Sequence, residues 1–312
     1  MKKIIYLTTI FLGVLIASCD YVGNPYPTRN VNLGDTSTCP APTFPTVTSH
    51  VKKILIEDYT ADRCPNCPRA ARILHVIDST YPGKIIGLAA HVSSSLASPL
   101  PGFGGPSYSF IDDYRTSVGN IYDALLINGN NGLPQGMINR KDYDAVNLTH
   151  RKFYLNWQAF VNGIIAEPSV VDLQININYD ASTRKICCAV RDSFLSSVPG
   201  TFRLVGLITQ DSIIGWQDDI DHGIVSNYVF NEMLRDAITP TGAWGELLVT
   251  GSASAGLKHI NKFAYNVPSG YSSPAAGSTP IPCDVNKCHI VAFIYNTATY
   301  EIIQSEVVKI TP

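Results

Sequence analysis

The stretch that decides the fold is residues 54–74, ILIEDYTADRCPNCPRAARIL. It opens with an apolar run that predicts a strand and closes with the periodic pattern of a helix. Cys64 and Cys67 lie at the junction, separated by Pro65 and Asn66. The unsatisfied amides of a helix N-terminus favour the thiolate, which is the nucleophile in disulfide exchange. The spacing therefore predicts a redox-active dithiol, at a site that is open on one side to admit a substrate sulfur.

The N-terminus indicates where this chemistry would take place. Lys2 and Lys3 precede an apolar run, 4–17, which is too short to span a bilayer and has the build of a secretory signal peptide. The run ends in LIASC at 15–19, which resembles a bacterial lipobox. An ordinary signal peptide with an incidental cysteine is the alternative. We predict a signal peptide over 1–18 and a lipid anchor at Cys19 that attaches the protein to a membrane.

Composition excludes one class of partner. The chain of 312 residues has 23 basic and 25 acidic side chains, and removal of 1–18 would take away two of the basic ones and none of the acidic ones. A negative balance argues against nucleic acid. A content of 45% hydrophobic residues with 16 Tyr suits a β-rich extracytoplasmic protein with a large core.

Patterning divides the mature chain into three zones. Residues 19–49 are rich in Pro, Thr and Asn without apolar period, and we predict a flexible tether there. Residues 50–166 alternate strand and helix signals and predict an α/β domain. Its predicted elements are strands at 52–59, 84–91 and 135–139 and helices at 65–80, 107–126 and 149–165.

The last zone, 167–312, changes to a period of two. Apolar and polar residues alternate over 171–178, which is typical of a half-buried strand. Further strands are predicted at 185–192, 202–209, 289–296 and 301–310, so this zone reads as an antiparallel β-sandwich of the immunoglobulin type. Residues 211–278 are poorly patterned and predict mostly loops, with one strand passing into a short helix at 227–238.

The 50–166 zone resembles the thioredoxin fold. The resemblance rests on the order of strand, CxxC helix, strand, helix and a strand introduced by Pro134. It implies that Cys64 attacks a substrate disulfide and that Cys67 resolves the mixed disulfide. It also implies that Asp58 takes the proton of Cys67, and that Pro134, in a cis peptide bond beside the sulfurs, orients the substrate strand.

The whole chain is similar to the Omp28-related outer membrane lipoproteins of Bacteroidetes, which join a lipobox, a thioredoxin-like domain and a β domain. The motifs EDYT at 57–60 and PQGMINR at 134–140 carry this resemblance. It implies an outer membrane lipoprotein on the periplasmic or surface face.

Three departures from the thioredoxin pattern stand out. A Ser/Pro/Gly-rich loop at 92–105 lengthens the domain and is expected to form a lid or a binding surface. A clear last strand is missing, and 143–146 is the candidate for a short one. Arg63 replaces an aromatic residue before the nucleophile, and its charge would favour the Cys64 thiolate.

The remaining cysteines constrain the fold. Cys283 and Cys288 bracket a turn-like loop and predict a local structural disulfide in an oxidising compartment. Cys187 and Cys188 are neighbours on a strand, so they face opposite sides of the sheet and one is expected to be buried. The pairing of Cys39 stays open.

Two functions fit these residues. The first is thiol:disulfide exchange on extracytoplasmic proteins, with the Cys64–Cys67 disulfide as the redox group, no other cofactor, no metal and an unidentified redox partner. The second is a non-catalytic outer membrane lipoprotein for adhesion, binding or envelope assembly, in which the disulfide is structural. A zinc half-site at the CxxC and an ordinary solvated acid at Asp58 are the alternative readings of these residues.

Overall fold

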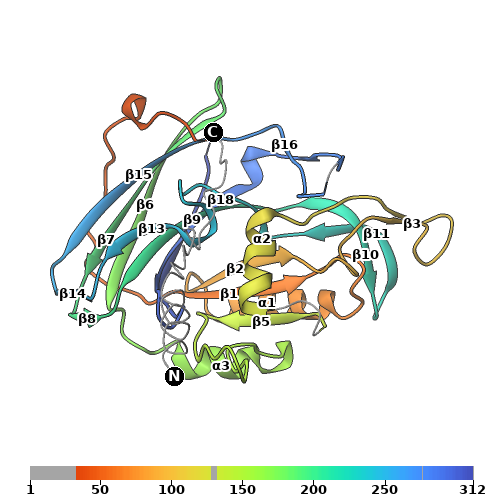
Figure 1. The fold of residues 1–312 in the computed structure, drawn as a ribbon, viewed down its shortest axis with the longest axis horizontal. Coiled ribbons are helices and arrows are strands. Elements are labelled where there is room, and N and C mark those ends of the chain that lie inside the picture. Colours follow the sequence, from red (N-terminus) through yellow and green to blue (C-terminus); the bar gives the residue numbers. More distant parts are fainter. Residues whose placement is uncertain (1–32, 128–131, 276, 312) are drawn as a thin grey trace, which may run out of the picture.

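A large mixed sheet organises the molecule (Figure 1). The computed structural model describes residues 33–127, 132–275 and 277–311. Within these ranges the main sheet has eight strands: β1 (Ile54–Thr60), β2 (Ile85–His91), β5 (Gln135–Ile138), β9 (Phe202–Gln210), β12 (Met233–Ala237), β13 (Glu246–Val249), β18 (Cys288–Asn296) and β19 (Ile302–Lys309). Their order is β19-β18-β9-β12-β2-β1-β5, and β13 pairs with β9.

Helices cover both faces of the β1–β2–β5 part. They are α1 (Cys67–Thr80), α2 (Ser117–Tyr122), the π-helix η2 (Asp123–Ile127) and α3 (Trp157–Ile164). Every residue of β1 is buried, as expected for a central strand. Ile54 and Ile56 pack under Leu74 of α1 and Trp157 of α3. On the opposite face, Leu55 packs against α2 and η2.

The main sheet continues across the boundary expected between 166 and 167. β12 lies parallel to β2, with Met233 opposite Ala89, and pairs on its other side with β9. Strands from the expected β domain thus extend the sheet that contains β1. At this junction the backbone N–H of Ala89 on β2 donates to the carbonyl of Glu232 at 2.9 Å, so β12 covers part of the outer edge of β2.

A second sheet packs over one end of the first. Its strands are β6 (Val171–Asp180), β7 (Lys185–Phe194) and β15 (Lys258–Asn266). Val171 of β6 and Val190 of β7 face Ile208 of β9 and Ile290 of β18 in one core. The strands of the period-two zone thus pack as two layers, one of which is the main sheet that also contains β1, β2 and β5, so they do not form a separate immunoglobulin-type sandwich. Burial of apolar side chains of this size contributes roughly 1.5–3 kcal/mol each.

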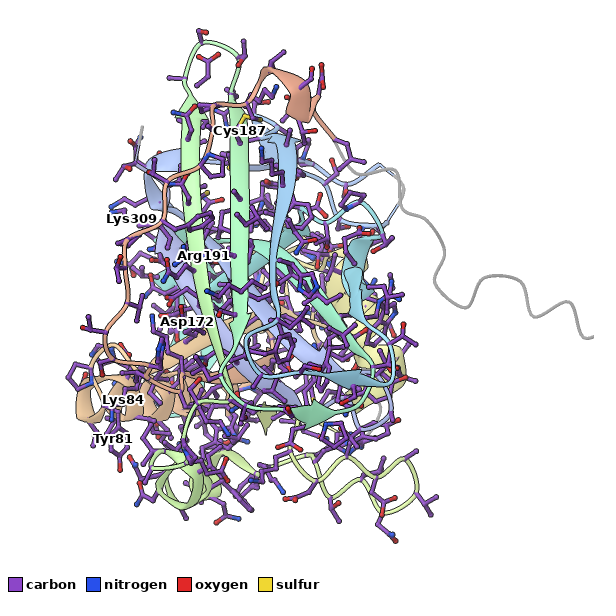
Figure 2. All side chains as sticks on the ribbon, turned by 90° about the vertical axis from the view of Figure 1, so that its left-hand side faces the viewer. Tyr81, Lys84, Asp172, Cys187, Arg191 and Lys309 are labelled. Carbon is purple, nitrogen blue, oxygen red and sulfur yellow. A yellow bond between two sulfur atoms is a disulfide. The ribbon has the colours of Figure 1, made fainter. Side chains whose placement is uncertain are left out.

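The expected tether is attached to this sandwich from Leu33 onward. Leu33 makes a β-bridge with Tyr265. Cys39, which follows the short 3-10 helix η1 (Thr36–Thr38), forms a disulfide with Cys187 on β7. The bond is visible beside the Cys187 label in Figure 2. A covalent link and a backbone pair hold this part of the segment on the fold, contrary to the expectation of a free tether over its whole length.

Three predicted elements differ from the structure. The helix expected at 107–126 covers only α2 and η2, because β4 (Ser109–Phe110) pairs with β3 (Leu100–Pro101). The helix expected at 149–165 is reduced to α3 and the 3-10 turn η4 (Tyr154–Asn156). Residues 143–146 form no strand, and the outer edge of β5 is met by an isolated bridge from Gly136 to Lys152.

The segment 211–278, expected to be mostly loops, is largely β-structure. It contributes β12, β13 and β15 to the two sheets, and β10 (Ile213–Asp219) pairs with β11 (Gly223–Phe230). The smaller pairs are β8 (Val198–Pro199) with β14 (Ser252–Ala253) and β16 (Gly270–Tyr271) with β17 (Ile281–Pro282), and the short 3-10 helices here and beyond are η5 (Gly242–Trp244) and η6 (Val285–Lys287). Within the described residues, no helix is both long and apolar enough to cross a bilayer.

Candidate functional site

The CxxC turn joins β1 to α1, as the sequence predicts. Cys64 and Cys67 form a disulfide with their Cα atoms 5.4 Å apart. The helix begins at Cys67 with Asn66 as its N-cap, so Pro65 precedes the helix and does not occupy its first position. Each cysteine is only 1% exposed. A site open on one side was expected, whereas the structure leaves both cysteines almost completely buried.

The β10–β11 hairpin covers the CxxC turn. The backbone N–H of Asp218 donates to the carbonyl of Asp62 at 2.8 Å, and that of Ile220 donates to the carbonyl of Pro65 at 2.9 Å. The two accepting carbonyl groups lie on either side of Cys64 in the sequence. The hairpin therefore lies where a substrate segment would have to approach the turn.

Ion pairs fasten the same hairpin to α1. Arg69 donates to both carboxylate oxygens of Asp221, at 2.5 and 2.9 Å. Arg72 donates to Asp219 at 2.8 Å and also to Asp221. The guanidinium groups are partly exposed, so each pair contributes at most about 1 kcal/mol.

The loop at 92–105 closes a second side. Arg63 is buried, and its guanidinium donates to the carbonyl of Ser98 at 2.7 Å and lies 5.5 Å from the ring centre of Phe103. On the side of the hairpin, the side-chain amide of Gln217 in β10 donates to the carbonyl of Cys64 at 3.2 Å. Arg63 thus holds the covering loop, a role that the sequence did not indicate.

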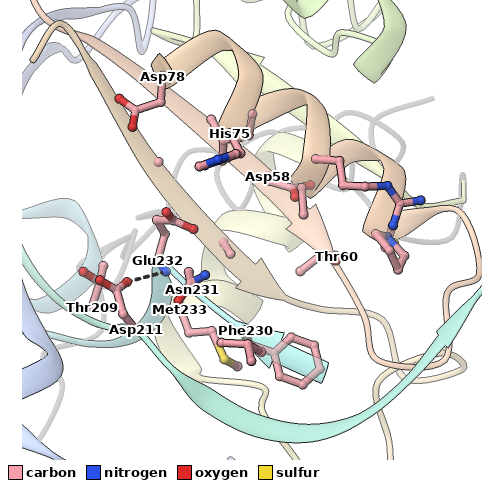
Figure 3. A pocket seen from close by; sticks show the side chains of 18 of the residues that line it. Asp58, Thr60, His75, Asp78, Thr209, Asp211, Phe230, Asn231, Glu232 and Met233 are labelled. Atoms are coloured by element: carbon pink, nitrogen blue, oxygen red, sulfur yellow. Dashed lines mark hydrogen bonds between the residues drawn. The ribbon is translucent and has the colours of Figure 1, made fainter. Parts of the chain in front are cut away.

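Asp58 is buried, which excludes the reading of a solvated acid at the end of a strand. It is 2% exposed, and its Oδ1 has no hydrogen-bond partner among the described residues. Burial raises the pKa of Asp58 to about 8, and the negative charge of Glu232 adds to the shift. Asp58 and Cys67 line one cleft (Figure 3 shows Asp58 there).

The proline loop also lies near the disulfide. The Leu133–Pro134 peptide bond is cis, as predicted. Leu133 packs against the cluster that contains Cys64 and Cys67. Pro134 and Asn66 line a common pocket. Of the four residues predicted to be catalytic, Cys64 and Cys67 are thus bonded to each other, Pro134 lies beside the CxxC turn, and Asp58 lines the cleft that Cys67 also lines.

The motifs EDYT at 57–60 and PQGMINR at 134–140 are joined by a buried ion pair. Arg140 donates to both oxygens of Glu57, at 2.6 and 2.8 Å, and both residues are at most 1% exposed. The guanidinium also lies 4.5 Å from the ring centre of Tyr122 and 5.1 Å from that of Phe293. These motifs therefore hold the sheet together on the face away from α1.

Several residues of this region were missed from the sequence. His91, Gln217, Tyr228 and Glu232 line the same cleft as Asp58. Three of them belong to the segment that was expected to be mostly loops. His91 was assigned no role from the sequence. Its position at the end of β2 did not show that it would be buried, because neighbouring residues that bury it come from the β10–β11 hairpin.

The other cysteines have mixed outcomes. Cys188 is a buried free thiol whose pKa burial raises to about 12, while Cys187 carries the disulfide on the opposite face, as predicted for adjacent strand residues. The expected Cys283–Cys288 disulfide is not formed, and the sulfurs are in contact at 3.7 Å. The Cys288 thiol donates instead to the carbonyl of Asp284. Cys19 lies outside the described residues.

Metal ligation finds no support in the described part of the chain. No group of three or more His, Cys, Asp or Glu side chains there is arranged to hold a metal ion. The thiols of the proposed zinc half-site are bonded to each other.

Comparison with known proteins assigns the family. No curated protein matches the chain. The solved structure of HBP35 of Porphyromonas gingivalis has a TM-score of 0.59 at 13% identity over 84% of this chain and 76% of that chain, which shows a similar fold. A domain of the outer membrane lipoprotein Omp28 from Porphyromonas gingivalis is 21% identical over 46% of this chain and 90% of its own length, with a TM-score of 0.29. The family model described as outer membrane protein Omp28 matches residues 126–312, more than half of the chain. The protein is therefore a component of the bacterial outer membrane, and the chain belongs to the Omp28 family.

Proposed function

We propose that this protein is a non-catalytic outer membrane lipoprotein that binds a partner at the envelope, and that its Cys64–Cys67 disulfide is structural. The observation that carries the proposal is the closure of the CxxC turn, where each cysteine is 1% exposed beneath the β10–β11 hairpin. Disulfide exchange requires a thiolate to reach a sulfur atom, so a covered disulfide is inert until its cover opens.

Attachment through lipid at Cys19 is part of this proposal. The LIASC sequence at 15–19 supports it, and family membership agrees with it. The Cys39–Cys187 disulfide ties the chain that follows this anchor to β7, the middle strand of the three-stranded sheet. An anchored protein would then present the sandwich and the cleft at the membrane surface, at a distance limited by the length of chain between Cys19 and Cys39.

Thiol:disulfide exchange in a thioredoxin-like domain is the second candidate. It is favoured by the buried Asp58 in the cleft that Cys67 also lines, and by the Pro134 loop beside them. In this scheme the reduced Cys64 thiolate attacks a substrate disulfide and releases one substrate thiolate. Cys67 then loses its proton to the ionised form of Asp58 and attacks Cys64, which releases the second substrate thiolate and leaves Cys64–Cys67 oxidised. The hairpin must move for either step.

A trapping experiment separates the two candidates. Cys67→Ser removes the resolving thiol, so a catalytic Cys64 would accumulate mixed disulfides with envelope proteins. We expect none above the level of the Cys64→Ser/Cys67→Ser control in non-reducing gels of membrane fractions. Mixed disulfides that depend on Cys64 would overturn the non-catalytic proposal. The rate at which the unmodified protein is reduced provides a second measurement, independent of the stability of the variants.

A further inference from the structure

A cleft of about 700 Å³ opens beside the CxxC turn. Its lining comes from the β1 and β2 floor, from α1 and from the residues that join β11 to β12. Figure 3 shows Asp58, His75 and Asp78 on one side of it and Phe230 and Glu232 on the other. Elements from both halves of the chain therefore build one concave surface.

Two buried polar side chains in this cleft have unpartnered atoms. Asp58 is 2% exposed and its Oδ1 accepts no hydrogen bond, while His91 is 3% exposed and both its ring nitrogens have no partner among the described residues. Thr60 pairs with His91 and Asp58 with Ala89 in the β1–β2 register, so Asp58 and His91 share one face of the sheet. Buried polar groups in native proteins are normally hydrogen-bonded, which indicates that a ligand supplies the missing partners.

Acidic side chains dominate the cleft. Asp78, Asp211 and Glu232 lie around the buried Asp58. Burial raises the pKa of Glu232 to about 7 and that of Asp58 to about 8, so these two carboxyl groups are partly or mostly protonated in the free protein at neutral pH. Among the described lining residues, Arg72 is the one with a permanent positive charge, and Asp219 and Asp221 engage its guanidinium. His91 is uncharged, because burial lowers its pKa to about 3.

The cleft also has room for the side chain of Glu232 and an aromatic wall. Glycine at position 87 leaves room for the side chain of Glu232, since a Cβ there would lie 2.9 Å from the Cγ of Glu232. Tyr228 and Phe230, whose ring centres are 4.9 Å apart, form an aromatic wall. Aromatic faces attract ammonium and guanidinium groups.

We propose that this cleft binds an organic cation, an amine or a guanidinium group, whose N–H groups donate to Asp58 and Glu232. A hydrogen-bonded carboxylate is the partner that a buried cation requires, so the bound cation would favour the ionised form of Asp58, whose proton is released to solvent. The inference rests on the proposed binding function and deepens it by naming the class of ligand. The cation is carried by a free small amine or by a basic side chain of a partner protein.

Isothermal titration calorimetry of the full-length protein in detergent tests the proposal. The probes are 1,4-diaminobutane, arginine amide and a lysine-containing tripeptide blocked at both ends, and 1,4-butanediol is the neutral control. We expect saturable binding of at least one cation and none of the diol. Binding of the free amines assigns a small-molecule ligand, whereas binding of the blocked tripeptide alone assigns a basic side chain of a partner.

Variants locate the binding. Glu232→Gln should weaken cation binding roughly tenfold, the effect of one charge-assisted hydrogen bond. The matched control is Asp180→Asn on the β6–β7 turn, where an amide oxygen can accept the same turn hydrogen bonds from Ser182, and it should leave binding unchanged. Equal binding of the diol, no binding of any cation, or equal losses in the two variants would overturn the proposal.

The outcome is separable from that of the proposed function. Cation binding is measured on the oxidised protein and needs no thiol. Trapped mixed disulfides would reject the non-catalytic proposal and leave the cation cleft standing. Absence of cation binding together with an inert disulfide would reject the cleft alone.

Discussion

Buried ionisable side chains determine how the free energy of unfolding of this protein depends on pH. Asp58 is removed from water without a partner for its Oδ1, so folding favours its neutral form. Its pKa is about 8 in the folded protein against an ordinary value of 3.8. The contribution of Asp58 to the free energy of unfolding is therefore complete below its ordinary pKa of 3.8. This contribution is lost as the pH rises through the folded pKa of about 8, because the buried carboxyl group must stay protonated.

Asp58→Asn should therefore raise the free energy of unfolding most in alkaline solution. We expect a gain of a few kcal/mol above the folded pKa of about 8, shrinking as the pH falls toward 3.8. Urea unfolding across this range measures it, with Asp180→Asn as the control. A variant that is less stable than the parent at alkaline pH would show that the ionised carboxylate has a partner.

In contrast to substitution of Asp58, substitution of one partner in the buried ion pair of Glu57 and Arg140 should lower the free energy of unfolding. Glu57→Gln leaves the Arg140 charge buried and should cost roughly 3–5 kcal/mol of unfolding free energy. The double variant Glu57→Gln/Arg140→Met removes the unpaired charge and should recover much of the loss. Denaturant unfolding measures both. Equal losses in the single and the double variant would mean that the pair does not act as a unit.

The sequence anticipated some of these residue positions and not others. The strand-to-helix switch around Cys64 and the Leu133–Pro134 pair are local patterns, and both were predicted. The burial of Asp58 and the partner of Arg63 depend on segments far along the chain, Gln217 to Glu232 and Ser98, so no local pattern revealed them.

At the level of elements, the β10–β11 hairpin controls access to the disulfide. β11 is largely exposed, with a buried residue only at its end, so it has no clear apolar period. The hairpin is attached to the CxxC turn by main-chain hydrogen bonds, and to α1 by the ion pairs of Arg69 and Arg72. For this reason 211–278 read as loops in the sequence, whereas the strongly periodic β6 was predicted correctly.

Weakening that hold should expose the disulfide. The Arg69→Ala/Arg72→Ala variant removes the ion pairs with Asp219 and Asp221, and we expect a several-fold faster reduction of Cys64–Cys67 by dithiothreitol. Mass spectrometry after alkylation of released thiols measures the rate. Lys141→Ala, which breaks the ion pair with Glu167 elsewhere, serves as the control. An unchanged rate in the double variant would mean that these ion pairs do not hold the cover.

The whole molecule is held together by a sheet that joins both halves. β12 pairs with β2 on one side and β9 on the other, so the half that contains Cys64 and the half that contains the sandwich share backbone hydrogen bonds. Periodicity predicted the strands of each half. It carried no information about which strand would lie beside β2, because pairing across more than a hundred residues leaves no local pattern.

This continuity predicts cooperative unfolding. Calorimetry of the full-length protein should show a single transition of the 50–312 region, and a fragment of residues 50–166 should fail to fold because the edge of β2 and the apolar face over α2 would be uncovered. Circular dichroism of the fragment measures this. Two separate transitions, or a folded fragment, would establish two independent domains.

The most direct test of the central claim is the reduction of Cys64–Cys67 in the folded protein as denaturant is added. A structural disulfide beneath its cover should be reduced only slowly by dithiothreitol in native buffer, and its reduction should accelerate with denaturant as the cover opens. Alkylation and mass spectrometry at each concentration report the two thiols. Rapid reduction without denaturant, followed by selective alkylation of Cys64 at neutral pH, would contradict the account and identify a redox-active site.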